Sequence, residues 1–339
     1  MSLYNDYLPL VQSLNDYGGN FASIRIRQPV LEAIDDGASN DPALRYVQSK
    51  LHEKMRQWTG LQDHVTFSEF FEAYYEGVFY LAAFHRGTSL RNITAGSGKG
   101  NTPDFETVRK PSVSFEVKTI DFAAPERTYN KIMSEGLDAK LEAQEQAKRT
   151  GVGSSIHVIA PHGDARNFKE VVEQVMKKID SNMKSGQYTR APTILVVCTA
   201  RTALNDRAEN LRKWLTFPDL TQPANGQLYA IAAHQVDEPF FFPSDHWRMN
   251  NLGPLGRAGI LRDHGYIAGL IFLSMESSMS NSHEPVKGIY SLNGIWNVDW
   301  EKSNSFGRQA TFCTKKVFET LCDAWNDTED SRSTLLPTQ

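Results

Sequence analysis

Two carboxylates and a lysine near the first third of the chain have a spacing that could support hydrolysis assisted by a metal ion. Polar and apolar residues alternate from Ser112 to Lys118, which places Glu116 and Lys118 on one face of a predicted strand. Asp104 begins a shorter predicted strand, and the turn that ends at Pro111 can bring its carboxylate beside Glu116. An ordinary strand with one solvated face would give the same alternation. The acidic residue upstream favours a site.

Magnesium chemistry would follow from these three residue types. Two carboxylates that are brought together repel each other unless a cation lies between them. A few oxygen ligands, with room for water and a substrate phosphate, suit Mg²⁺. Such an ion polarises a phosphate and lowers the pKa of a bound water. Lys118 could then orient or deprotonate that water and offset charge on the phosphate.

The charge distribution favours an anionic substrate at this place. Residues 86–118 carry six basic side chains against three acidic ones, in a chain of 339 residues whose formal net charge is −4. A protein that coats nucleic acid indiscriminately depends on neutralising many phosphates, and this net charge argues against that class. A local basic cleft is compatible with this net charge.

The elements that must position these residues follow an α/β order. Residues 1–64 form a predicted N-terminal helical region, with helices that begin at Pro29 and after Asp41. Residues 65–218 form the predicted core and residues 219–339 a mixed C-terminal extension, packed on that core. The core elements are a buried helix (68–85), an opening strand (92–94), strands over 104–108, 112–120, 155–160 and 193–199, and helices over 134–150, 168–184 and 206–217. A last helix is predicted over 310–325.

The segment resembles the PD-(D/E)XK nucleases, whose motif reads here as Pro103-Asp104, eleven residues, then Glu116-Val117-Lys118. The resemblance implies a restriction endonuclease-like fold, in which a mixed central β-sheet is flanked by helices in the order helix, strand, strand, strand, helix, strand. It also implies Asp104 and Glu116 as metal ligands and Lys118 as a catalytic residue. It covers about the middle 130 residues and leaves both ends unexplained.

Members of this family often add an acid from the helix before the sheet. Glu69, Glu72 and Glu76 lie near one stripe of that predicted helix. The resemblance favours Glu76 as a metal ligand and catalytic residue, because in relatives such as the Holliday junction resolvases the acid lies about three turns before the glycine that ends the helix, here Gly87. Glu72 is the alternative. A solvated stripe is the competing interpretation for each glutamate.

Four further residues are candidate nucleic-acid contacts. Lys99 lies in a glycine-rich run that lacks the Walker spacing and is predicted to be a loop. The helix after the motif strand carries Lys140, Gln144 and Lys148 at intervals of four, and the family commonly touches the phosphate backbone with this helix. Surface solubility would explain any one of them equally well.

The predicted function is that of a Mg²⁺-dependent DNA endonuclease of the restriction or defence type, with Mn²⁺ able to substitute and a homodimer suited to double-strand cleavage. A structure-specific repair or recombination nuclease is one alternative. A non-catalytic nucleic-acid-binding protein that keeps the fold is the other. The three cysteines show no spacing typical of zinc ligands. The chain shows neither a signal-peptide pattern nor an apolar run of about 18 residues, so a cytoplasmic location is expected.

Overall fold

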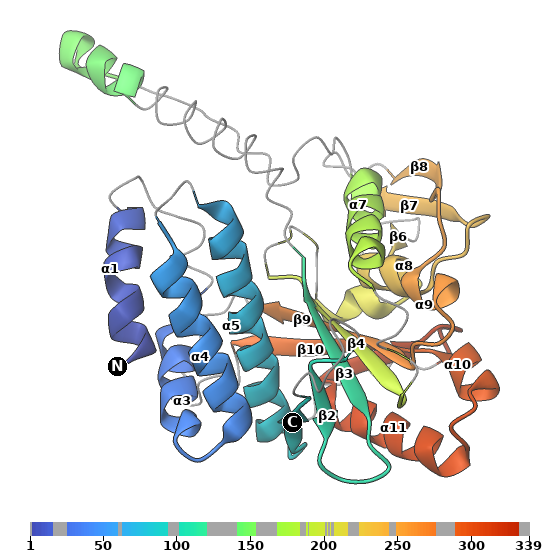
Figure 1. The fold of residues 1–339 in the computed structure, drawn as a ribbon. Coiled ribbons are helices and arrows are strands. Elements are labelled where there is room, and N and C mark those ends of the chain that lie inside the picture. Colours follow the sequence, from blue (N-terminus) through green and yellow to red (C-terminus); the bar gives the residue numbers. More distant parts are fainter. Residues whose placement is uncertain are drawn as a thin grey trace.

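A seven-stranded mixed sheet lies at the centre of the computed structural model (Figure 1). The structure describes residues 2–15, 26–59, 63–93, 102–120, 141–153, 168–183, 188, 190–200, 202, 204, 207–215, 224–243, 249–275 and 289–331. Its strands, in spatial order, are β1 (Leu90–Asn92), β2 (Phe105–Thr107), β3 (Ser114–Thr119), β4 (Thr193–Cys198), β9 (Gly269–Met275), β10 (Tyr290–Trp296) and β11 (Ala324–Asp327). The predicted α/β class is confirmed.

The pairing within the sheet changes direction at β3. Strands β1 and β2 are antiparallel, as are β2 and β3, whereas β4 runs parallel to β3 and β9 parallel to β4. Beyond them β10 is antiparallel to β9, and β11 is parallel to β10. Three strands of the predicted C-terminal extension therefore belong to the same sheet as the motif strand, and the sheet crosses the boundary expected at residue 218.

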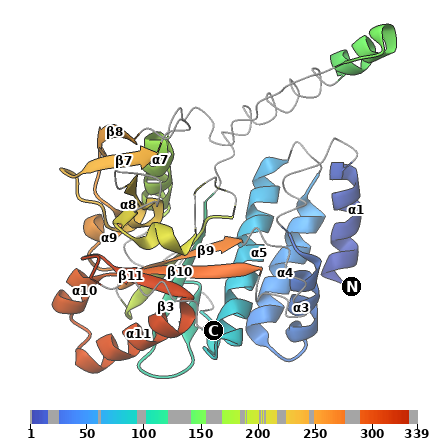
Figure 2. The ribbon, with the colours of Figure 1, turned by 180° about the vertical axis from the view of Figure 1, so that it is seen from behind.

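Helices from the first quarter of the chain lie on one side of the sheet, with α4 and α5 nearest to it (Figures 1 and 2). These are α1 (Leu3–Asn15), α3 (Gln28–Ala38), α4 (Pro42–Gln57) and α5 (His64–His85). As expected, α3 and α4 have a proline in the first turn, and the Asp41 carboxylate caps α4 by accepting from the backbone N–H groups of Ala43 and Leu44. Helix α5 begins earlier than expected, because Asp63 rather than Ser68 caps it.

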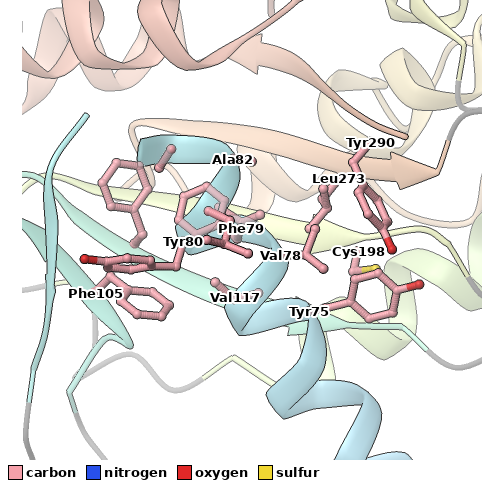
Figure 3. Close-up of a cluster of buried hydrophobic side chains, with 14 of the residues drawn as sticks. Tyr75, Val78, Phe79, Tyr80, Ala82, Phe105, Val117, Cys198, Leu273 and Tyr290 are labelled. Carbon is pink, nitrogen blue, oxygen red and sulfur yellow. The ribbon is translucent and has the colours of Figure 1, made fainter. Parts of the chain in front are cut away.

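Helix α5 is buried on nearly every face, as its sequence predicts. Phe79 packs against the rings of Phe105 and Phe115, which ties the helix to β2 and β3. Figure 3 shows its side chains among residues from the sheet, including Val117 and Leu273. One apolar cluster extends from α1 through α5 to α11 (Arg308–Leu321). The helices before residue 64 therefore share a core with the sheet.

The opposite face carries a second apolar cluster under α7 (Phe168–Ser181), α8 (Gln227–Ala233) and α9 (Ile260–Asp263). Alternation along the strands divides the two cores: Ile194 and Val196 face the α5 side, while Leu195 and Val197 face the α7 side. The remaining elements are η2 (Ala208–Leu211), α10 (Val298–Ser303) and the hairpins β5–β6 (Trp214–Leu215, Ala224–Asn225) and β7–β8 (Pro239–Pro243, Met249–Pro254).

Two sequence-based predictions of helices are corrected. Residues 207–215, the described part of the helix predicted over 206–217, instead contain the single turn η2 and then β5. The last helix ends at Leu321, and Trp325 lies in β11, paired with Gly294 of β10. The predicted strand over 155–160 and residues 134–140 of a predicted helix lie outside the described residues. In the described part of the chain, none of the helices is both long and apolar enough to cross a membrane.

Candidate active site

The carboxylate of Asp104 takes the place of a backbone carbonyl as the hydrogen-bond acceptor in one link between β2 and β3. The two strands pair only at Phe105 with Phe115 and at Glu106 with Ser114. One residue before β2, the N–H of Asp104 donates to the carbonyl of Phe115 at 3.0 Å. Its Oδ2 then accepts the N–H of Val117 at 2.8 Å. The aspartate therefore lies against the backbone between Glu116 and Lys118, the other two residues of the motif.

Glu116 and Lys118 contact each other on one face of β3. The Lys118 Nζ donates a hydrogen bond to Oε1 of Glu116. Because Phe115 and Val117 face α5, these two side chains project toward the α7 side. Glu116 is 1% exposed, whereas the Lys118 side chain retains 21% of its exposure. A buried carboxylate is costly unless it is paired, and the lysine provides that pairing.

Glu76 of α5 is a third acid, whose charge interacts with that of Asp104. It is 8% exposed, and both of its carboxylate oxygens accept from Lys50 Nζ of α4, at 3.0 and 3.1 Å. Burial raises the pKa of Glu76 to about 7, and the charge of Asp104 adds to this increase against the opposing effect of Lys50. Burial lowers the pKa of Lys50, but Glu76, with smaller effects of Tyr46 and Asp104, outweighs it, so that the net change is an increase.

Asp104 connects the two halves of this cluster. Burial also raises the pKa of its carboxyl group, although the hydrogen bond from Val117 and the charges of Lys118 and Lys50 oppose the change. Asp104, which is partly buried, and Glu76, which is buried, thus form a pair of mutually repelling carboxylates. Such pairs of perturbed acids are typical of functional sites.

The three glutamates on the stripe of α5 differ in their surroundings. Glu69 is exposed and pairs with Lys54 at 2.8 Å. Glu72 is also exposed, and its pKa is raised, mainly by desolvation, while Lys118 opposes the increase. Glu76 is the one that is buried beside Asp104. The structure therefore separates Glu76, the favoured candidate, from the two exposed acids.

Sequence reasoning missed two residues of the site, Lys50 and Tyr188. Tyr188 is 2% exposed, and its pKa is raised by burial and then by the charge of Glu116, with a smaller effect of Asp104. Lys50 lies 26 residues before its partner Glu76. No local spacing marks either residue, since both reach the site only through tertiary packing.

Of the four candidate nucleic-acid contacts, the two that the structure describes, Gln144 and Lys148, do not join this cluster. Lys99 and Lys140 lie outside the described residues. Gln144 and Lys148 are exposed on a helix over residues 141–150, and Figure 1 draws that helix away from the sheet. Their predicted contact with a phosphate backbone remains a prediction.

The donor set fits a hard divalent cation in chemical type. Carboxylate oxygens are the ligands that Mg²⁺ prefers, and Asp104, Glu116 and Glu76 supply them. Within the described ranges, no group of three histidine, cysteine, aspartate or glutamate side chains is arranged to hold a metal ion. Ammonium groups contact two of the three carboxylates, Glu116 through Lys118 and Glu76 through Lys50. For all three carboxylates to coordinate one ion, Lys118 and Lys50 would have to release the carboxylate oxygens that they contact.

The raised pKa of Glu76 predicts a pH-dependent stability of the metal-free protein. A carboxyl group whose pKa rises from 4.5 to about 7 on folding stabilises the fold fully below pH 4.5, and this contribution is lost as the pH rises through 7. Between about pH 5 and pH 8, the wild type should therefore lose at least about 1 kcal/mol of unfolding free energy that Glu76→Gln does not lose. Urea denaturation in EDTA measures the difference. Glu69→Gln is the matched control, and parallel pH curves for Glu76→Gln and the wild type would contradict the expectation.

Comparison with models of known families, with curated proteins and with solved structures finds no match. The arrangement of side chains described above is therefore the basis on which a function is inferred.

Proposed function

We propose that this chain is a Mg²⁺-dependent DNA endonuclease of the restriction or defence type, related in architecture to the PD-(D/E)XK nucleases. One observation carries the proposal. The Asp104 carboxylate is bound to the backbone between Glu116 and Lys118, and Lys118 contacts Glu116. A buried glutamate, a partly buried aspartate and a lysine are thereby held together by the pairing of β2 with β3.

The order of elements supports the same proposal. Helix α5 is followed by β1, β2 and β3 as antiparallel neighbours, then by α7, with the helix over residues 141–150 before it, and then by β4 parallel to β3. This is the order of helix, strand, strand, strand, helix and strand that the resemblance implies. Asp104 lies one residue before β2, and Glu116 and Lys118 lie in β3.

The chemical roles follow from burial and charge. Asp104, Glu116 and Glu76 would hold the ion, which supplies charge stabilisation at the phosphate and activates water when bound. Lys118 keeps a fifth of its side chain exposed, so that its Nζ can reach a phosphate oxygen while its stem stays on β3. There it donates a hydrogen bond to the charge that develops on the phosphate and orients the attacking water. Burial of Glu116 excludes competing bulk water from its oxygens.

Cleavage of supercoiled plasmid DNA tests the proposal. Wild-type protein should convert the plasmid to nicked or linear product with Mg²⁺ or Mn²⁺ and leave it intact in EDTA. Asp104→Asn keeps an oxygen that can accept from Val117 but removes the charge, and cleavage should fall at least about 100-fold. Glu106→Gln is the matched control, because Glu106 lies two residues along the same hairpin and pairs with Arg91.

The outcomes separate the functional classes. Cleavage confined to forks, flaps or junctions would favour a repair or recombination nuclease. Binding of DNA without any cation-dependent cleavage would overturn the proposal in favour of a non-catalytic binder. Thermal unfolding of each variant establishes that lost cleavage does not reflect lost folding.

A further inference from the structure

Two parallel ion pairs join α4 to α5, and only one of them lies at the candidate site. Lys54 contacts Glu69 at 2.8 Å, where the glutamate side chain is 45% exposed. One turn earlier in α4, Lys50 contacts Glu76 at 3.0 Å, where the glutamate side chain is 11% exposed. The residue types and the two helices are the same, so the pairs differ chiefly in their burial and in their distance from Asp104.

The Lys50–Glu76 pair matters more for stability than the Lys54–Glu69 pair, because it is buried. An exposed ion pair contributes about 0–1 kcal/mol to stability, because water and salt screen it. Removing one member of a buried pair leaves an uncompensated charge and is strongly destabilising. Here the uncompensated charge would be Glu76, which already repels Asp104. Lys50 thus supplies the positive charge that these two carboxylates need in the absence of a metal ion.

Lys50 also takes up the oxygen atoms that a cation would use. Its Nζ lies within 3.1 Å of both Oε1 and Oε2 of Glu76. Both oxygens of this carboxylate therefore accept hydrogen bonds from the same ammonium group. A divalent ion bound by Glu76 would meet a positive charge at close range, and the repulsion between them weakens its binding.

We propose that Lys50 is a positioning residue that acts as a placeholder for the cation: it holds the Glu76 carboxylate beside Asp104 and competes with a divalent ion for its oxygen atoms. This inference rests on the proposed function, since it concerns the same metal centre. It assigns a role at the site to the N-terminal helical region, because α4 contributes the ammonium group of Lys50. The other residues of the site lie on α5, just before β2 and on β3. Metal binding is then an exchange of one cation for another.

Replacing Lys50 by methionine should tighten divalent cation binding. The stem of the side chain is kept and the charge is lost. Isothermal titration calorimetry with Mn²⁺ in alkaline buffer, where carboxyl groups are ionised, should give at least about a tenfold lower Kd for Lys50→Met than for the wild type. In EDTA the same variant should melt at a lower temperature, and saturating Mn²⁺ should raise its Tm more than that of the wild type.

Two control variants separate this role from a purely structural one. Lys54→Met removes the exposed pair on the same helices and should leave the Mn²⁺ affinity unchanged. Lys50→Arg keeps the charge and should retain an affinity close to that of the wild type. If Lys50→Met lowers Tm equally with and without Mn²⁺ and leaves Kd unaltered, Lys50 is only structural and the inference is wrong. If the wild type binds no divalent cation, the proposed metal centre and this inference both fall.

Discussion

Lys118→Met is expected to reduce the rate of DNA cleavage by about 10²–10⁴-fold while leaving DNA affinity within a few-fold of the wild-type value. The variant keeps the apolar stem on β3 but removes the ammonium group that contacts Glu116. One lysine is a small part of the electrostatic attraction for a DNA backbone, so binding should change little. Single-turnover cleavage at saturating Mg²⁺ measures the rate, and binding in EDTA measures the affinity.

A second lysine on the same hairpin provides the control. Lys110 is exposed and its Nζ contacts the hydroxyl of Ser112, away from the carboxylates. Lys110→Met should therefore cleave at nearly the wild-type rate. Because Lys118→Met leaves Glu116 buried beside an apolar group, the double variant Glu116→Gln/Lys118→Met checks for a loss of stability. Near-normal cleavage by Lys118→Met would exclude the lysine from catalysis.

Trp296→Ala is expected to lower the free energy of unfolding by about 3–5 kcal/mol. Trp296 is fully buried in β10 and packs against Trp300 and Phe318, with ring centroids 5.6 and 5.3 Å away. Its Nε1 also donates to Glu301 at 2.6 Å. Truncation would create a cavity where β10 meets α11 and leave Glu301 without this donor. Urea denaturation followed by circular dichroism measures the loss.

The same experiment tests whether the C-terminal strands are integral to the fold. Because β9, β10 and β11 continue the sheet from β4, Trp296→Ala should shift one cooperative transition that includes the N-terminal helices. Phe312→Ala on α11 should shift it by less than about 0.5 kcal/mol, since Phe312 is 68% exposed. An early transition of the C-terminal third alone would contradict a single core.

The parts of the fold that were predictable from sequence are those with local signals. A proline and an aspartate mark the start of α4, and strict alternation marks β3, so both elements are found where the sequence places them. Helix α11 was predicted too long because the residues after Leu321 pair with β10, and strand pairing between distant segments leaves no helical or turn signal. The prediction of a helix over residues 206–217 was wrong for a similar reason. The side chain of Asn210 accepts from the N–H of Gln227, and this tertiary contact stabilises a turn instead of a helix.

The residues of the candidate site can likewise be divided into those that local sequence signals predict and those that only tertiary packing brings to the site. The sequence places Glu116 and Lys118 on one face because a strand has a period of two residues. It favours Glu76 through its position before the end of the helix, and the structure then distinguishes Glu76 from Glu69 by burial. The contact of Lys50 with Glu76 depends on how two helices cross. Such a contact has no signature in the spacing of residues along one chain.

The bond between the Asp104 side chain and the Val117 backbone has a consequence for sequence comparison. The aspartate is located by the strand it touches, so the turn between β2 and β3 could gain or lose residues without moving the carboxylate. Insertions at this exposed turn would change the number of residues that separate the motif's two halves while its geometry stayed the same. Homologues that diverge in this way would share the site and yet escape a search that assumes a fixed interval.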